Sequence, residues 1–384
     1  MSEERPILLV TCGDPAGIGP EVAAAAWLDQ ASHAAARLRI VAEAGVVDAG
    51  LEALGASNPP AVVEIEPDDL RPSGPGELLV IPPAKLPRVN LPGHPTGGPS
   101  AREADNAKDD KIEQTVAAPA RPTAGGGRAA AEAVLAAVGA VRQGLAAGIV
   151  TGPLNKAGLA AAGYDLPGHT ELLARALGLP DAAASMMLWL PPGPGLASAD
   201  GLGVVHTTLH ERLAAAVGHI TQDRIEQAGR RLDAMLRRLL GRQPRLAVAA
   251  VNPHAGEAGL FGDEEKRIVG PAVHTLASEG LTVSGPHAAD TLFVRAAAGV
   301  HDGVVAQYHD QGHIPIKLLG MHRAVNITLG LPIVRTSVAH GTAFDIAGRG
   351  VADPSSMKSA ILAAAKLAAG PQAATITAAE APRV

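Results

Sequence analysis

The segment Val305–Leu319, VAQYHDQGHIPIKLL, carries the pattern on which the fold prediction depends. It begins as a buried strand, predicted over Gly303–Tyr308, and ends in an apolar run. Two histidines, an aspartate, a glutamine and a lysine lie between those ends. An α/β protein usually builds its active site where strands end. The segment therefore predicts a buried strand that is followed directly by a cluster of reactive side chains.

The same order of elements recurs along the chain. Strand-like runs are followed by Gly/Pro signals and then by helical patterns, such as the Ala-rich stretches Arg128–Gln143 and Glu211–Leu240. This alternation predicts an α/β fold with mostly parallel strands. One exception, SMMLWLPPGPGLASADGLGVVHTT at residues 185–208, predicts an antiparallel hairpin. The predicted strands are Ile7–Thr11, Leu38–Ala42, Ala61–Ile65, Glu77–Ile81, Gly148–Thr151, Ser185–Leu190, Leu202–Thr207, Leu246–Val251, Gly303–Tyr308, Val325–Leu329 and Ile333–Val338.

Composition excludes several classes of protein. A chain of 384 residues with 47% apolar residues allows one or two domains with a sizeable core. The few aromatic residues and a net charge of −6 argue against a nucleic-acid partner. The single cysteine, Cys12, rules out an internal disulfide and suits a reducing compartment. With no signal-peptide pattern and no long apolar stretch, we expect a soluble, cytoplasmic protein without membrane contact.

Two segments break the α/β pattern. Pro95–Gly127 is polar, rich in Pro, Gly and Ala, and has no periodicity, so it predicts a mobile insertion. The tail after Gly370 has a similar composition and is expected to be loose as well.

Histidines concentrate behind strand-like runs. Twelve of the fourteen fall between His169 and His340, and His210, His254 and His309 each follow a predicted strand. Three imidazoles at strand ends could share one divalent ion and leave positions open for substrate and water. Each alone could equally be a structural or surface histidine, and their spacing is not a compact metal motif.

Several other polar residues stand in unusual surroundings. Lys317 lies in IPIKLLG, a run that otherwise predicts burial, so it either snorkels, meets an anion or has a lowered pKa. Asp310 and Asp290 are nearby carboxylates, and Asp290 could simply cap a helix. Asn326 and Arg335 are polar residues on β-prone runs, and with Lys317 nearby in sequence they favour an anion pocket over a core ion pair.

Two glycine-rich segments and one helix start complete the candidates. TCGDPAGIGPEV, residues 11–22, could bind an anion or merely make a tight connection, and it matches neither GxGxxG nor Walker A. SVAHGTAFDIAGRG, residues 337–350, could wrap a nucleotide. His169 and Thr170 begin a predicted helix, where an anion or hydroxyl is favoured.

Together, these segments resemble the 4-hydroxythreonine-4-phosphate dehydrogenase family. The motifs, in order, are GDPAGIGPE, TGPLNKAGL, GHTELL, NPHAGEAGLFG, GPHAADTLF, YHDQGHIPIK, NITLGLPIVRTS and HGTAFDIAGRG. The resemblance implies a two-lobed fold similar to isocitrate and isopropylmalate dehydrogenases, with a cleft between α/β/α lobes. Residues 1–160 with 325–384 would form the first lobe and 161–324 the second. It also implies a homodimer whose active sites use residues of both subunits.

The resemblance also assigns roles to residues. His210, His254 and His309 match metal ligands, for zinc, magnesium, manganese or cobalt. The matches to substrate-binding residues are His169, Thr170, Lys317, Asn326 and Arg335. The loop His340, Gly341, Thr342 and Ala343, with Asp345 beyond it, matches the NAD or NADP site. Lys317, Asp310 and Asp290 remain unranked candidates for acid–base work.

The implied reaction is metal-dependent oxidation and decarboxylation of a phosphorylated hydroxy acid. The expected substrate is 4-phosphohydroxy-L-threonine, giving 3-amino-2-oxopropyl phosphate for pyridoxal phosphate biosynthesis. PLNKAGLAAAGYDLPGHTE is closer to relatives acting on D-threonate or D-erythronate 4-phosphate. HTTLHE and HDQGHIPIKLL also resemble cis-dihydrodiol dehydrogenases of aromatic-acid degradation. From a different class, the chain could be a non-catalytic metabolite-binding protein.

Overall fold

The computed structural model describes residues 5–91, 94, 121–166 and 168–370, in two compact units. Unit 1 comprises Met1–Ala184 and Leu331–Val384, and unit 2 comprises Ser185–Gly330. Residues 95–120 of the predicted insertion, and the tail after Gly370, lie outside the described residues. The sequence-based lobe boundaries at residues 160 and 325 stay a prediction, because compactness alone does not identify functional lobes.

Unit 1 is built on parallel strands in the order β3-β4-β2-β1-β5-β12. Its centre is apolar on both faces: Leu8, Leu9 and Val10 of β1 are at most 2% exposed. Such continuous burial is expected for a parallel sheet covered by helices on both faces. The strands are β1 Ile7–Thr11, β2 Arg37–Val41, β3 Ala61–Glu64, β4 Glu77–Ile81, β5 Gly148–Thr151 and β12 Val334–Val338.

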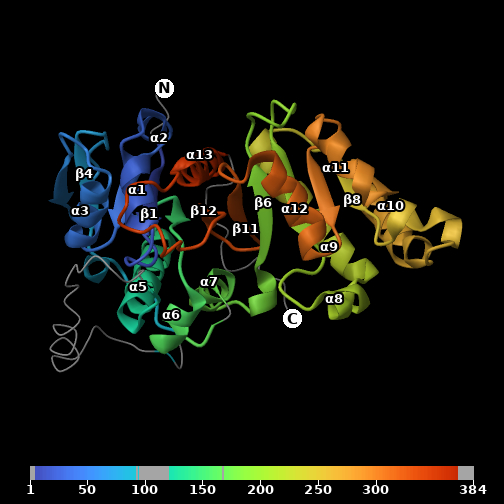
Figure 1. Cartoon of the computed structure of the whole chain (residues 1–384), viewed down its shortest axis with the longest axis horizontal. Coiled ribbons are helices and arrows are strands. Elements are labelled where there is room, and N and C mark those ends of the chain that lie inside the picture. Colours follow the sequence, from blue (N-terminus) through green and yellow to red (C-terminus); the bar gives the residue numbers. More distant parts are fainter. Residues whose placement is uncertain (1–4, 92–93, 95–120, 167, 371–384) are drawn as a thin grey trace. The chain divides into compact units, whose positions relative to one another are not determined.

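Helices cover both faces of this sheet (Figure 1). The first group packs together on one face: α1 Gly19–Trp27, α2 Gln30–Ala35, α3 Ala44–Ala53 and α13 Ser355–Ala369. The second group is α5 Ala124–Arg142, α6 Lys156–Ala161 and α7 His169–Ala176, and the short turns η1 Pro83–Lys85 and η2 Asp181–Ala183 connect elements. The prediction that the insertion reaches Gly127 is wrong, because α5 already begins at Ala124, where the side chain of Thr123 accepts a hydrogen bond from Gly126 N.

Unit 2 has strands in the order β11-β6-β7-β10-β8-β9. The pairs β11/β6 and β6/β7 are antiparallel, which confirms the predicted hairpin, and the other pairs are parallel. Sequence patterns missed β9 because its run, VSGPH, contains Gly and Pro and is only half-buried. The strands are β6 Ser185–Leu190, β7 Leu202–His206, β8 Leu246–Ala249, β9 Val283–His287, β10 Gly303–Ala306 and β11 Val325–Leu329.

Helices α9 and α10 pack together in unit 2, as do α11 and α12 (Figure 1). The predicted helix Glu211–Leu240 is two helices, because Thr221 caps a new one by accepting a hydrogen bond from Arg224 N. The prediction that Asp290 is an N-cap is also wrong: Ala288 holds that position and Asp290 lies in the first turn. The helices and turns are α8 Leu213–His219, α9 Gln222–Leu240, α10 Gly270–Ser278, α11 Ala289–Ala297, α12 His309–Gly320, η3 Pro253–Gly259 and η4 Glu265–Val269.

Helix α12 corrects the expectation that the run after His313 enters the core. Ile316 is buried, but Ile314 is 55%, Leu318 82% and Met321 51% exposed. The helical period places residues 314, 318 and 321 on one face, opposite the buried one. A run that is apolar in sequence is therefore divided here between the core and the surface. Within the described ranges, no helix combines the length and apolar character needed to cross a membrane.

Candidate active site

A buried cation marks a candidate anion site in unit 1. Arg335, on β12, is 4% exposed, and its Nη2 and Nε donate to Thr151 Oγ1 over 2.6 and 3.2 Å. Burial lowers the pKa of Arg335 to about 9, so the guanidinium is still charged at neutral pH. A desolvated cation attracts an anion far more strongly than an exposed one. Sequence reasoning missed Thr151, although it closes the motif strand GIVT.

His169 supplies a second polar atom to the same region. It is the first residue of α7, after Gly168, and its Nε2 is buried with no hydrogen-bond partner in the described structure. Burial, and then the charge of Arg335, hold the pKa of His169 well below its usual range. The imidazole is therefore neutral at pH 7 and can donate or accept a hydrogen bond. Thr170 follows it in the first turn, where the helix dipole favours an anion.

The glycine-rich loop of residues 339–350 is held by the first loop of the chain. Ile18 N donates to Thr342 O over 2.9 Å, and a Cβ on Gly17 would lie 2.7 Å from that oxygen. The carboxylate of Glu21, 2% exposed, accepts hydrogen bonds from Gly348 N and Gly350 N. The loop is thus anchored at Thr342 and at its glycine end.

Those contacts favour the tight connection among the two interpretations of TCGDPAGIGPEV. Gly17 N donates to Asp14 O, Ala16 N to the Asp14 carboxylate, and Ile18 N to Thr342 O. Three amides of the motif are therefore used in contacts within the protein. The motif is a tight connection that supports the 339–350 loop, in which His340, Gly341 and Asp345 stay at least partly exposed and Ala343 has a φ of 41°.

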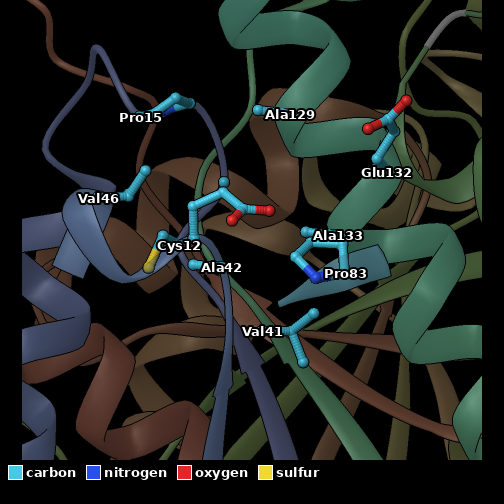
Figure 2. A pocket seen from close by; sticks show the side chains of 11 residues that line it. Cys12, Pro15, Val41, Ala42, Val46, Pro83, Ala129, Glu132 and Ala133 are labelled. Atoms are coloured by element: carbon cyan, nitrogen blue, oxygen red, sulfur yellow. The ribbon is translucent and has the colours of Figure 1, made fainter. Parts of the chain in front are cut away.

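A small pocket of about 110 Å³ lies beside this connection (Figure 2). Its walls are mostly apolar, including Val41, Ala42 and Ala133, and its only charged lining groups are two glutamates. Burial raises the pKa of the Cys12 thiol to about 12, so this lining residue is not a thiolate nucleophile. A pocket without a basic side chain is unsuited to phosphate, so Arg335 stays the candidate anion site described in unit 1.

Two of the predicted metal ligands lie together in unit 2. His309 begins α12, and His210 follows β7; their ring centres are 5.8 Å apart. Two imidazoles that share a zinc ion, with Zn–N distances of about 2.0–2.1 Å, have ring centres roughly 5–6 Å apart. His309 Nδ1 donates to Asp310 Oδ1 over 2.6 Å, which leaves Nε2 as the ligand atom. This carboxylate–histidine arrangement is usual behind a metal ligand, so the pair fits a divalent ion.

Two further histidines that sequence reasoning missed support this pair. His313 stacks on His309 with ring centres 3.8 Å apart, and its Nδ1 lies 3.1 Å from Nε2 of His206. Burial, and then the charge of His309, lower the pKa of His313 to about 4. One feature of the sequence could have identified His313: it lies four residues after His309, and this spacing puts both side chains on one face of a helix. Both added rings are neutral at pH 7.

His254 stands apart from the pair. Its side chain is 64% exposed, its Nδ1 lies 3.0 Å from Glu257 Oε2, and its ring meets the edge of Phe261. Among the residues that the structure describes, no three His, Cys, Asp or Glu side chains are grouped so as to hold a metal ion. One chain therefore places two of the three predicted ligands side by side and the third on a separate exposed turn.

The remaining predicted residues lie on three elements of unit 2. Asp310 is next to His309, and Lys317 is exposed on the last turns of the same helix. Asn326 is on β11, opposite Leu188 of β6. Asp290 is exposed in the first turn of α11, and no described contact joins it to the imidazole pair.

Comparison with known proteins reveals similarity over almost the whole chain. The family model of the pyridoxal phosphate biosynthetic protein PdxA matches residues 84–364. A 4-hydroxythreonine-4-phosphate dehydrogenase of Methylorubrum extorquens is 38% identical over 374 residues, 96% of each chain. A D-threonate 4-phosphate dehydrogenase of Pectobacterium atrosepticum is 38% identical over 363 residues, 94% of this chain and 99% of that one. The solved 4-hydroxythreonine-4-phosphate dehydrogenase of Klebsiella pneumoniae is 37% identical with a TM-score of 0.73, covering 94% of this chain and 99% of that chain.

Proposed function

The chain belongs to the family of the pyridoxal phosphate biosynthetic protein PdxA, and from this premise we propose that its substrate is 4-phosphohydroxy-L-threonine. NAD or NADP would take a hydride from the hydroxyl carbon, and loss of carbon dioxide would leave 3-amino-2-oxopropyl phosphate. D-Threonate 4-phosphate is the second candidate, because a relative named for it is equally similar. Both substrates carry a phosphate and a secondary hydroxyl that can be oxidised to a ketone.

The observation that carries this proposal is the buried cation of unit 1. Arg335 is 4% exposed and oriented by Thr151, and the unpartnered Nε2 of His169 lies within its electrostatic reach. A phosphate would accept bonds from both side chains and from the start of α7, which holds Thr170.

The imidazole pair supports the metal-dependent half of the proposal. His210 and His309 would hold the ion through nitrogen, leaving sites for substrate oxygens, which suits zinc, cobalt, manganese or magnesium. A bound ion would lower the pKa of a substrate hydroxyl and polarise the forming ketone. Asp310 orients His309 by accepting the hydrogen bond from Nδ1, and so is not the free base.

Lys317 is then the strongest acid–base candidate. It lies on α12, the helix of His309 and Asp310, and its charge reaches His313. Lys317→Arg keeps the charge but has no readily transferable proton, so kcat should fall by about 10²-fold or more. An unchanged kcat would return the role to Asp290.

We also propose that a second copy of the chain completes the metal site. Helix α12 carries His309 on one end and exposes Ile314, Leu318 and Met321 on its outer face. Leu260 and Phe261, near His254, are likewise 73% and 48% exposed. Exposed apolar groups of this size mark interaction surfaces. A homodimer would cover them and could supply His254 of one copy to the pair of the other.

A turnover assay tests the proposed function. Reduction of NAD or NADP is followed with 4-phosphohydroxy-L-threonine, D-threonate 4-phosphate, D-erythronate 4-phosphate and an aromatic cis-dihydrodiol. We expect turnover with a phosphorylated acid and none with the dihydrodiol. Turnover of the dihydrodiol alone would overturn the proposal, and a protein that binds these ligands without turnover would be the non-catalytic alternative.

A further inference from the structure

The turn that carries His254 has an unusual backbone. His254, Ala255, Glu257 and Ala258 all have φ between 43° and 56°, and Gly256 has φ 81°. Left-handed backbone costs roughly 1–2 kcal/mol for each residue with a side chain. Four such residues in five form only when surrounding groups hold them. This left-handed turn, residues 254–258, therefore needs a neighbouring group that stabilises it.

Glu265 contacts the residues just before the turn and the glycine at its middle. Its Oε1 accepts hydrogen bonds from Val251 N at 2.9 Å and Asn252 N at 2.8 Å, and its Oε2 accepts one from Asn252 Nδ2 at 3.0 Å. A Cβ added to Gly256 would lie only 2.7 Å from the same Oε2. The carboxylate thus binds the chain where it leaves β8 and packs against the glycine at the centre of the turn.

The surroundings of Glu265 fit a role in positioning rather than an incidental contact. The residue is 7% exposed, and its hydrogen bonds go to main-chain amides and to Asn252. It starts a π-helical segment, Glu265–Val269, in which backbone hydrogen bonds span five residues instead of four. Such π-helical turns occur frequently at functional sites. Asn252 is also held by Glu264, which accepts from its Nδ2 at 2.7 Å.

We propose that Glu265 is a positioning residue that holds the left-handed turn and so directs the ring of His254 toward a metal ion. Glu265 does not bind the ion itself. It acts through the backbone of Val251 and Asn252, whereas Glu257 orients the His254 ring directly through Nδ1. The inference depends on the proposed metal role of His254.

The test uses the full-length protein and zinc as the probe. Glu265→Gln keeps the size of the side chain but removes its charge. Asp263→Asn makes the same change two residues away, at an exposed acid that pairs with Arg267. Calorimetry measures zinc affinity, and hydrogen exchange measures the amides of Val251 and Asn252. We expect zinc binding about tenfold weaker or worse and faster exchange in Glu265→Gln. Asp263→Asn should match the wild type in both.

A second variant tests whether weaker zinc binding reflects a local change in the turn or a general loss of folding. Gly256→Ala keeps Glu265 but puts a methyl group against its carboxylate, and it should weaken zinc binding while leaving phosphate binding at Arg335 unchanged. Wild-type zinc affinity in both Glu265→Gln and Gly256→Ala would overturn the inference. His254→Ala distinguishes a failure of the Glu265 inference from a failure of the proposed metal role of His254. If His254→Ala binds zinc like the wild type, His254 is not a ligand, and both the metal role and the inference fail.

Discussion

The candidate anion site of unit 1 and the candidate metal site of unit 2 differ in how complete each is within one chain. Arg335 is 4% exposed and already oriented by Thr151, whereas the side chain of His254 is 64% exposed and stands on its own turn. The first site is shaped by the interior of a single unit. The second offers two adjacent imidazoles, at the start of a helix whose outer face exposes Ile314, Leu318 and Met321. A buried site can be complete in a monomer, whereas the proposed metal site would need a second copy of the chain.

The comparison predicts that the two sites can be disabled separately. His309→Ala should lower kcat/KM by about 10³-fold or more, because metal activation contributes several kcal/mol to the reaction. Phosphate binding should be unaffected, because Arg335 and His169 lie in unit 1. Steady-state kinetics and phosphate titration measure the two effects. A matched His322→Ala control removes an imidazole beyond the end of α12. A parallel loss of phosphate affinity would show that the sites are not independent.

Mixing two inactive variants tests whether the imidazole site is shared between copies. A heterodimer of His254→Ala and His309→Ala chains has one intact site if ligands come from both copies. After unfolding and joint refolding, activity should recover to about a quarter of the wild-type value. Each variant refolded alone is the control. Without any recovery, all ligands would have to come from one chain.

The anion site should be sensitive to geometry as well as charge. Arg335→Lys keeps the charge but loses the planar guanidinium, which donates to Thr151 and would donate to a phosphate at the same time. We expect kcat/KM for the phosphorylated substrate to fall about 30-fold, which corresponds to roughly 2 kcal/mol. Arg142→Lys, at the exposed end of α5, is the matched control. Equal activity of both variants would remove Arg335 from substrate binding.

The smallest effect is a pH dependence of phosphate binding. Burial lowers the pKa of Arg335 to about 9 in the free protein, and a bound dianion must raise it, because the charged form is the one that binds. Affinity should therefore be full below pH 9 and fall about tenfold for each pH unit above it. Calorimetry between pH 7 and pH 10, where the loss should be about tenfold, measures this. A constant affinity over that range would show that Arg335 stays charged or does not bind phosphate.

Sequence patterns identified most of the architecture because buried strands are chemically distinctive. Runs such as Ile7–Thr11 and Glu77–Ile81 are apolar, short and bounded by turn residues, and both are strands with those bounds. The strand Val283–His287 was missed because Gly and Pro interrupt it. The exposed face of α12 could not be foreseen from an apolar run, because burial depends on which elements pack against a helix.

The candidate site was only partly accessible from the sequence. His169 and Arg335 were identified by residue type and motif, and the structure places them within electrostatic reach of each other. Thr151, His206 and His313 were missed, since ordinary residues become informative only through what they touch. Glu265 likewise looks like one more surface acid until its bonds to main-chain amides are seen.

The sequence by itself determined the α/β class, the family and the kinds of side chain available for chemistry, because these follow from local periodicity and from residues in a fixed order. Only the tertiary structure decided which groups are desolvated, which rings adjoin and which turn is held in a left-handed conformation. Those properties arise from contacts between residues far apart in the chain, as between Arg335 and Thr151. A one-dimensional pattern does not encode such distances explicitly.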